Sequence, residues 1–503
     1  MPMHSPEPPD VESSAPEPRP AHGLGQKGAR AAVQLTVRSV LIRGLSFLTM
    51  LVLARILDPV DFGVYAVISF MLTLFVLIGD MGLGAALVQS EQEPTNEQQA
   101  AVWTSQLLMA AFFIVVIWLA SPLVSLVGPT LPPNTAWMLR ILSLSLIPVA
   151  LRALPSVMLG RHLRFGPLAM SEVLAQIGYG GTAITLAALG IGAWSFVAAA
   201  LVQFTVGAIF LNVAWGHFAG LRFSLRGIRE LMSFGIEYQV ATILAWLRDG
   251  PIPFIGAVVL GTLAAGLLDL AWAIGSAAAM IDATIGRVAF PMFSRLQDRR
   301  ADQSRALEIA ISLTALVSVP VQFWIAAVAP ILIPMVFGAK WTLAVAPVQG
   351  VCIGMMFRFP TRYLWQIAFA NGSSRMGLYL AGTSSALALL PFVPALKLLG
   401  LPGAGAAFII GSFAAFAVTA IVCSRFVSMS WVRFSRFVVM GAIAALPTHI
   451  VATTIHGVGG LVVGTAIFAG LFGSYVLSQD RALVKVALRY ARDALGRGVP
   501  DPV

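Results

Sequence analysis

Charged side chains are scarce in this chain of 503 residues, where Asp, Glu, Lys and Arg together make up only 11%. A soluble domain carries about 25% of these residues. No long polar block follows the N-terminal arm, so the composition leaves no room for a second, soluble domain. Hydrophobic residues make up 58% of the chain and the mean hydropathy is +0.87, so nearly all of it must lie in lipid. The composition therefore predicts an all-α, polytopic membrane protein.

Cysteines, metal-ligand spacings and nucleotide-binding motifs are equally sparse. The two cysteines, Cys352 and Cys423, both fall inside apolar runs, which is typical of buried core residues and gives no reason to expect a disulfide. The six histidines show no ligand spacing, so neither a metal site nor a cofactor is expected. No Gly-rich phosphate loop ends in Lys-Ser/Thr, and the predicted outer loops are too short for sugar chemistry. We therefore do not expect an enzyme.

The N-terminal arm, residues 1–24, is rich in Pro, Glu and Ser, a composition that cannot form a packed core or an apolar signal segment. We expect it to be disordered and retained, with the first membrane span as its own insertion signal. The formal net charge of +10 suggests nucleic acid as a partner, but the basic residues form short clusters between apolar runs. That pattern is typical of membrane topology, so no nucleic-acid partner is expected.

Apolar runs of about 20 residues, each long enough to cross about 30 Å of hydrocarbon as a helix, recur along the chain and are separated by Gly, Pro and Arg. They predict about fourteen transmembrane helices. The expected spans are residues 33–56, 63–88, 101–121, 136–159, 167–189, 193–216, 232–258, 264–290, 306–336, 341–369, 375–396, 401–424, 435–455 and 458–478.

Lysines and arginines are distributed unevenly among the segments between these spans. If the N-terminus is cytoplasmic, almost all of the loop lysines and arginines fall in inner segments, and only Lys340 and Lys397 fall in outer loops. An excess of positive charge marks the cytoplasmic side of membrane proteins. The pattern therefore predicts an even number of spans, with both termini cytoplasmic.

The chain contains a weak internal repeat. The segment ARILDPVDFGVYA of the first hairpin resembles VVLGTLAAGLLDLA near the exit of the seventh span, which aligns Leu57 with Leu260 and Gly63 with Gly266. An even number of spans separates the two, so the repeat would be parallel, about an axis normal to the membrane. We expect two pseudo-symmetric six-helix lobes followed by two extra helices. The expected segments are an arm at 1–30, an N-terminal lobe at 31–216, a cytoplasmic linker at 217–231, a C-terminal lobe at 232–426, two added helices at 427–480 and a basic cytoplasmic tail at 481–503.

Charged residues within or at the rim of the spans are candidates for function, because an ionisable side chain in lipid costs at least ~2.5 kcal/mol unless it faces protein or water. Their abundance predicts a polar, water-filled cavity that holds more basic than acidic groups. The basic residues are Arg43, Arg55, Arg140, Arg152, Arg248, Arg287, Arg358 and Arg362, and the acidic residues are Asp80, Glu172, Glu237, Asp249, Asp269 and Asp282.

The seventh span is expected to break beside charged residues. Arg248 is followed by Asp249-Gly250-Pro251-Ile252-Pro253, where each proline removes a backbone donor. Glu237 lies about three turns before Arg248, on the same helix face. A broken helix beside charged residues is a common binding-site device in transporters.

The tenth span carries two arginines on one face. Arg358 and Arg362 are one turn apart, with Pro360 between them. Each guanidinium group offers a planar fork of donors, so the pair is suited to clamping a phosphate.

Purely structural roles are open for several of these residues. Arg55, Arg140, Arg152 and Arg287 lie near span ends, where long basic side chains snorkel to lipid headgroups. Glu237 with Arg248, or Asp282 with Arg287, would also suit an ion pair inside the bundle.

Three stretches carry a family resemblance. RGLSFLTMLVLARILDPVDFGVYAVISFMLTLFVLIGDMGLGAALVQ, GRHLRFGPLAMSEVLAQ and GIGAWSFVAAALVQ resemble the bacterial polysaccharide transporter family, the Wzx-like oligosaccharide flippases. These belong to the multidrug/oligosaccharidyl-lipid/polysaccharide flippase superfamily. The resemblance covers roughly residues 30 to 430, and the two final helices also match the fourteen-span form of the family.

The resemblance implies a flippase of the bacterial inner membrane that carries undecaprenyl-pyrophosphate-linked oligosaccharide repeat units to the outer leaflet by alternating access. A cationic cavity would hold the head group while the polyprenyl tail stays in lipid. Arg43, Arg248, Arg358 and Arg362 are the candidates for the pyrophosphate, and Asp80, Glu237 and Asp249 for ion coupling or charge pairing. A polysaccharide polymerase and export machinery would be partners.

Three alternatives stay open at this point. A peptidoglycan-precursor flippase would share the cationic cavity. A multidrug exporter of the same superfamily would favour an acidic cavity, whereas here the basic residues outnumber the acidic ones. The third alternative is a non-transporting membrane component of a polysaccharide assembly complex.

Overall fold

The structure, a computed structural model, describes residues 42–90, 92–126, 130–217, 220–222, 224, 235–236, 239–240, 242–371, 374–455, 457–481 and 483–485. Every regular element in these ranges is a helix. The predicted arm and most of the predicted linker and basic tail lie outside the described residues. The prediction of an all-α, multi-pass membrane protein is confirmed.

The first half of the chain forms a series of helices joined by short turns. Asp58 begins one of them: its backbone N–H donates to Oδ2 of Asp61 at 3.1 Å, and Pro59 follows at the first helical position. The helices are residues 42–56, α2 Pro59–Asp80, α3 Leu83–Gln89, α4 Asn96–Ala120, η1 Ser121–Leu126, α5 Thr135–Ser143, α6 Leu146–Arg161, α7 Phe165–Ala188 and α8 Trp194–Trp215.

The second half is also a series of helices joined by short turns, and one of them, α13, is unusually long at 38 residues. A short helix at residues 242–247 precedes α10 Pro251–Leu260, α11 Thr262–Ala278, α12 Met280–Arg295, α13 Arg300–Phe337, η2 Ala339–Ala344, α14 Val345–Ala370, α15 Ser374–Leu389, α16 Phe392–Leu399 and α17 Leu401–Cys423. The chain then continues into α18 Val432–Thr454 and α19 Gly457–Gln479.

Ten helices among the described residues are long and apolar enough to cross a membrane, and α10 and α11 are shorter apolar helices. The number of fourteen spans stays a prediction. Some expected spans contain a break, such as the turn at Leu144 between α5 and α6. There the hydroxyls of Ser143 and Ser145 each donate to a carbonyl three residues earlier, at 2.6 Å, which competes with continuous helix.

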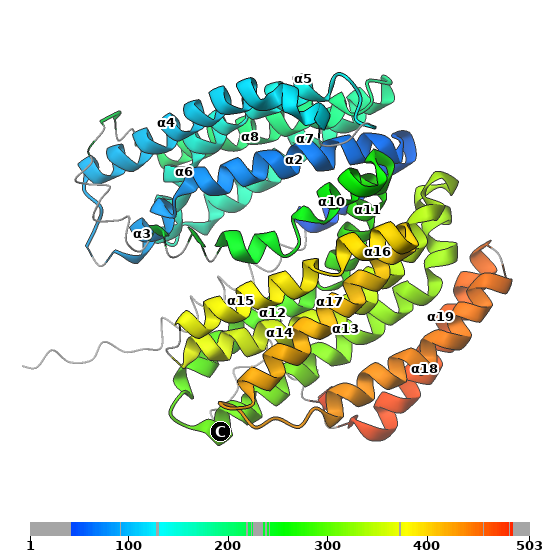
Figure 1. Ribbon diagram of the computed structural model, residues 1–503. Helices are drawn as coiled ribbons and strands as arrows, with labels where there is room; N and C mark the ends of the chain where they lie inside the picture. Colours follow the sequence, from blue (N-terminus) through cyan, green and yellow to red (C-terminus); the bar gives the residue numbers. More distant parts are fainter. Residues whose placement is uncertain are drawn as a thin grey trace, which may run out of the picture.

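Figure 1 shows α2–α8 gathered on one side of the molecule and α12–α17 on the other, with α10 and α11 between them beside α2. Helices α18 and α19 pack on each other and on α13 at the far edge. A large hydrophobic cluster joins both halves, since it includes Phe62 and Phe196 from the first and Leu267 and Trp341 from the second. The lobe boundaries given above stay a prediction.

Two glycines make a very close approach between the halves. A Cβ atom on Gly63 of α2 would lie 1.9 Å from the carbonyl oxygen of Thr262, and a Cβ on Gly266 of α11 would lie 1.8 Å from the carbonyl oxygen of Pro59. Only glycine permits this backbone contact. The predicted internal repeat aligns these same two glycines. If that repeat is parallel, equivalent positions would meet near its axis.

Candidate functional site

Two arginines from distant parts of the chain share one carboxylate. The seventh span breaks at residues 248–250, as its prolines predict, and this turn carries Arg248 and Asp249. Nε of Arg248 lies 3.3 Å from Oδ1 of Asp249. A terminal nitrogen of Arg358, from α14, donates to Oδ2 of the same aspartate. The three side chains form a cluster with one net positive charge, which we call the arginine cluster.

Aromatic faces hold both guanidinium groups of the arginine cluster. The Cζ of Arg248 lies 5.2 Å from the ring centroid of Trp365, and the Cζ of Arg358 lies 4.9 Å from that of Trp272 and 5.6 Å from that of Phe408. Such cation–π contacts fix the plane of each guanidinium and leave its edges for hydrogen bonds.

The arginine cluster is nearly enclosed. The side chains of Arg248 and Arg358 are 13% exposed and that of Asp249 is 19% exposed. A void of about 10 Å³ adjoins the two arginines and is also lined by the hydroxyl-bearing residues Thr361, Ser384 and Ser412. It is at the lower limit for one water molecule, so any larger ligand requires the cluster to open.

No other predicted site residue that the structure describes forms an ion pair with this cluster. Arg362 is exposed, one turn beyond Arg358, and acts electrostatically on the buried Asp282. Arg43 is exposed near the first described residue. Glu237 lies outside the described residues. Among the described residues, the structure therefore brings Arg248, Asp249 and Arg358 into direct contact, and Arg362 acts electrostatically on Arg248.

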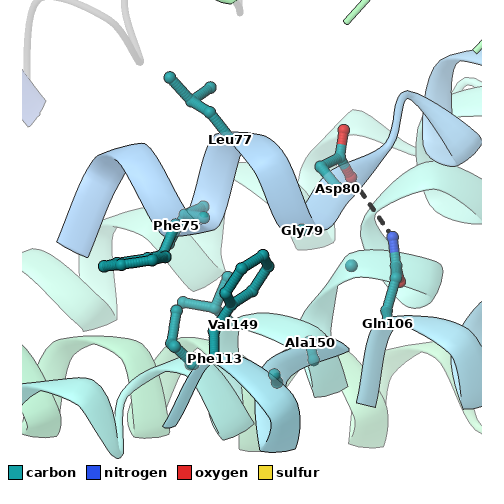
Figure 2. Close-up of a pocket in the computed structure, with 12 residues that line it drawn as sticks. Phe75, Leu77, Gly79, Asp80, Gln106, Phe113, Val149 and Ala150 are labelled. Atoms are coloured by element: carbon teal, nitrogen blue, oxygen red, sulfur yellow. Dashed lines mark hydrogen bonds between the residues drawn. The ribbon is translucent and has the colours of Figure 1, made fainter. Parts of the chain in front are cut away.

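Asp80, the last residue of α2, lies in the first half of the molecule. Its Oδ1 accepts a hydrogen bond from Nε2 of Gln106, on α4, at 3.3 Å. Both residues line a separate cavity, shown in Figure 2. In the described part of the chain, no group of three or more His, Cys, Asp or Glu side chains is placed to hold a metal ion.

Hydrogen bonds reinforce the approach of Gly63 and Gly266. Nε of Arg55 donates to the carbonyl of Val336 at 2.6 Å, and Nζ of Lys340 donates to the carbonyl of Arg55 at 3.2 Å. Nε1 of the fully buried Trp341 donates to the carbonyl of Ala54 at 2.8 Å. These bonds and the glycine pair are together called the hairpin contact, because they tie the first hairpin to the second half of the chain.

The hairpin contact also gives the exposed Arg55 a hydrogen-bond partner within the protein. Arg140 likewise donates to Oγ of Ser121 at 2.6 Å, and its Cζ lies 4.7 Å from the ring centroid of Trp137. Helix ends in this bundle pack closely enough to satisfy these guanidinium groups.

Sequence reasoning missed the aromatic partners Trp272, Trp365 and Phe408, and it missed Gln106. Trp272 carries one available signal, since it falls inside the expected span 264–290 rather than at a span end, where tryptophan usually gathers. Trp365 lies near the end of the expected span 341–369 and carries no such signal. Gln106 is a single amide inside a long apolar run, which is also unusual.

Comparisons with known proteins agree on one family. A family model described as polysaccharide biosynthesis protein matches residues 52–346. The succinoglycan biosynthesis transport protein ExoT of Rhizobium meliloti is 29% identical over 61% of this chain and 62% of its own length, so the chain spans less than two thirds of that relative. The lipopolysaccharide biosynthesis protein WzxC of Escherichia coli is 24% identical over 67% of this chain and 68% of its own length.

The fold is also similar to a solved structure, the lipid II flippase MurJ in an inward closed conformation. The TM-score is 0.73 at 12% identity, over 89% of this chain and 100% of that one. At this identity the likeness concerns the fold alone.

Proposed function

Because the chain belongs to the polysaccharide biosynthesis protein family, we propose that it is a flippase for undecaprenyl-pyrophosphate-linked oligosaccharide repeat units. It would move them from the inner to the outer leaflet of the bacterial inner membrane, for exopolysaccharide or lipopolysaccharide assembly. The observation that carries this proposal is the arginine cluster, a net positive group at a break in a membrane helix.

The arginine cluster is suited to a pyrophosphate. Guanidinium forks bind phosphate oxygens in pairs, and Trp365 and Trp272 already fix the two guanidinium planes. In the present conformation the Asp249 carboxylate takes up these donors. We expect the pyrophosphate to replace that carboxylate when the cluster opens. Arg43 and Arg362, both exposed, would contact the head group on its way in or out.

Alternating access would involve the hairpin contact. With both termini cytoplasmic, as the charge pattern predicts, this contact would lie at the outer side and would close the present conformation to the outside. Cargo would enter from the cytoplasmic side, with its polyprenyl tail remaining in lipid between the lobes. The hairpin contact would then part to release the head group. Asp80, Glu237 and Asp249 are the candidates for coupling to an ion gradient. Removal of the product by a polymerase and export machinery is the other way to drive transport.

The test is accumulation of the lipid-linked repeat unit on the cytoplasmic face of cells that carry Arg248→Ala or Arg358→Ala. Arg425→Ala, at an exposed arginine outside the cluster, is the matched control, and the membrane abundance of each variant is measured. Inner-face accumulation at normal abundance supports the proposal. Normal polysaccharide export from both cluster variants would mean that the arginines are structural.

The alternatives have their own outcomes. Rescue of cells depleted of their peptidoglycan-precursor flippase would identify that cargo instead. Efflux of organic cations without effect on polysaccharide would identify a multidrug exporter. Purified protein that fails to move lipid-linked repeat units in vesicles, while export in cells still requires it, would indicate a non-transporting assembly component.

A further inference from the structure

The first half of the molecule contains a partly open cavity, apart from the arginine cluster. It has a volume of about 220 Å³ and lies between α2, α4 and α6 (Figure 2). Its walls are mainly apolar. At one end stand the rings of Phe75 and Phe113, whose centroids are 5.2 Å apart. At the other end stand Asp80 and Gln106.

The polar end of this cavity has an excess of hydrogen-bond acceptors. The Asp80 carboxylate accepts from Gln106 and from the backbone N–H of Gly82. Gln106 is only 6% exposed, and its Oε1 has no hydrogen-bond partner. Within the described ranges no basic side chain forms an ion pair with Asp80. A negative charge and a free amide oxygen therefore border the same apolar space, where burying them without a partner is costly.

The size of the cavity and the negative charge at its polar end together exclude several classes of ligand. A proton would neutralise Asp80 but would leave the cavity empty. A hard metal cation takes about six or more oxygen ligands, whereas the lining side chains offer oxygens from Asp80 and Gln106 only. A purely apolar guest would leave the carboxylate unpaired. An apolar cavity of about 150 Å³ already holds benzene, so this larger one has room for an aromatic ring and a short chain.

We propose that this cavity binds a small hydrophobic amine. Its ammonium group would donate to the Asp80 carboxylate and to Oε1 of Gln106, and its apolar body would lie against Phe75 and Phe113. The site is separate from the arginine cluster, whose net charge is positive and which would repel such a ligand.

The position of the cavity gives this ligand a regulatory role. Asp80 is followed by Met81 and Gly82, whose φ angles of 49° and 68° form a left-handed turn. That turn packs on Gly235 at the start of the second half, because a Cβ on Gly82 would lie 2.0 Å from the Gly235 carbonyl oxygen. The carbonyl of Leu77 in the same last turn of α2 accepts from Gln239. An amine bound to Asp80 would hold this contact in place and slow the exchange of conformations.

The binding test uses the full chain in lipid nanodiscs with 2-phenylethylamine as the probe and 2-phenylethanol as its uncharged match. Equilibrium dialysis should show saturable binding of the amine, with the alcohol about ten- to hundredfold weaker, the value of a buried charge-assisted hydrogen bond. Asp80→Asn should abolish this preference. Asp302→Asn, at an exposed acid of α13, should keep it.

Ala150→Phe tests the site by filling it, because Ala150 lines the cavity. This substitution leaves the Asp80 carboxylate in place. It should lose both probes, and thermal unfolding checks that each variant is folded. Equal binding of amine and alcohol to the wild-type chain, a preference retained in Asp80→Asn, or unchanged binding in Ala150→Phe would each overturn the proposal. Absence of saturable amine binding to the wild-type chain would do the same. None of these outcomes bears on the arginine cluster, so the flippase proposal is tested separately.

Discussion

Replacing Gly266 by alanine should weaken the hairpin contact without touching the arginine cluster. The added methyl group would lie 1.8 Å from the carbonyl oxygen of Pro59 and 3.0 Å from the backbone nitrogen of Gly63. Both atoms belong to the backbone of α2, so no side chain can turn away to make room. Helices α2 and α11 would have to separate by roughly 1 Å at this point.

The size of the effect follows from overpacking. Inserting a methylene-sized group into a well-packed contact costs about 1–3 kcal/mol. The cost falls on the conformation in which the two glycines touch, and it is relieved where the hairpin moves away. The ratio of the closed to the open form should therefore fall by roughly 5- to 150-fold.

The assay is a distance measurement between spin labels at the two sides of the hairpin contact. Leu123, in η1, and Leu343, in η2, are both 59% exposed and suit labelling through introduced cysteines. Both native cysteines are buried, which keeps the labelling selective. We expect a longer-distance population to appear in Gly266→Ala, together with slower flipping in vesicles.

Gly181→Ala is the matched control, because a Cβ at Gly181 of α7 meets nothing within 4 Å. It should keep the wild-type distance distribution. If Gly266→Ala gives the same distribution and the same flipping rate as Gly181→Ala, the two glycines do not meet in the membrane and the reasoning from the hairpin contact is wrong.

Three further changes test the arginine cluster and the hairpin contact. Asp249→Asn leaves the guanidinium groups of Arg248 and Arg358 without a counter-charge, so thermal unfolding should show that the protein loses about 3 kcal/mol of stability. Undecaprenyl pyrophosphate should restore this stability. A melting curve that the lipid does not change would contradict the pyrophosphate site. Arg358→Lys keeps the charge but loses the planar fork, so flipping in vesicles should fall about tenfold, and a wild-type rate would count against bidentate binding. Trp341→Phe leaves the carbonyl of Ala54 buried without its donor, which should cost about 1–3 kcal/mol of stability in thermal unfolding, whereas an unchanged melting temperature would remove that hydrogen bond from the hairpin contact.

The fold was largely accessible from the sequence because the length of an apolar run maps directly onto the thickness of a bilayer. Prolines also predicted one helix break correctly, since Pro251 and Pro253 indicated that the seventh span is interrupted after Arg248. Breaks without such a signal were not predictable. The turn at Leu144 depends on serine hydroxyls inside an apolar run, and the break at Ala279 between α11 and α12 follows no proline or glycine signal.

The candidate site was accessible only in part. Arg248, Asp249 and Arg358 stood out because a charge in lipid is costly enough to need a reason. Their aromatic partners could not be found from spacing, because Trp272 lies on α11 and Trp365 on α14, and the pairing of those helices is a tertiary contact. Gln106 escaped notice because a neutral amide leaves no mark on a charge pattern.

The acid in the middle of the arginine cluster has an electrical consequence. In the proposed transport cycle the guanidinium groups and the Asp249 carboxylate stay with the protein, so the charge that crosses the membrane is that of the cargo. Every unbalanced elementary charge is worth about 2.3 kcal/mol per 100 mV of membrane potential. The interior of a bacterium is negative, so outward movement of a net negative cargo is downhill. Under the proposed function the flipping rate should therefore follow the voltage across the membrane, while Asp249 holds the net charge of the emptied arginine cluster at one in place of two.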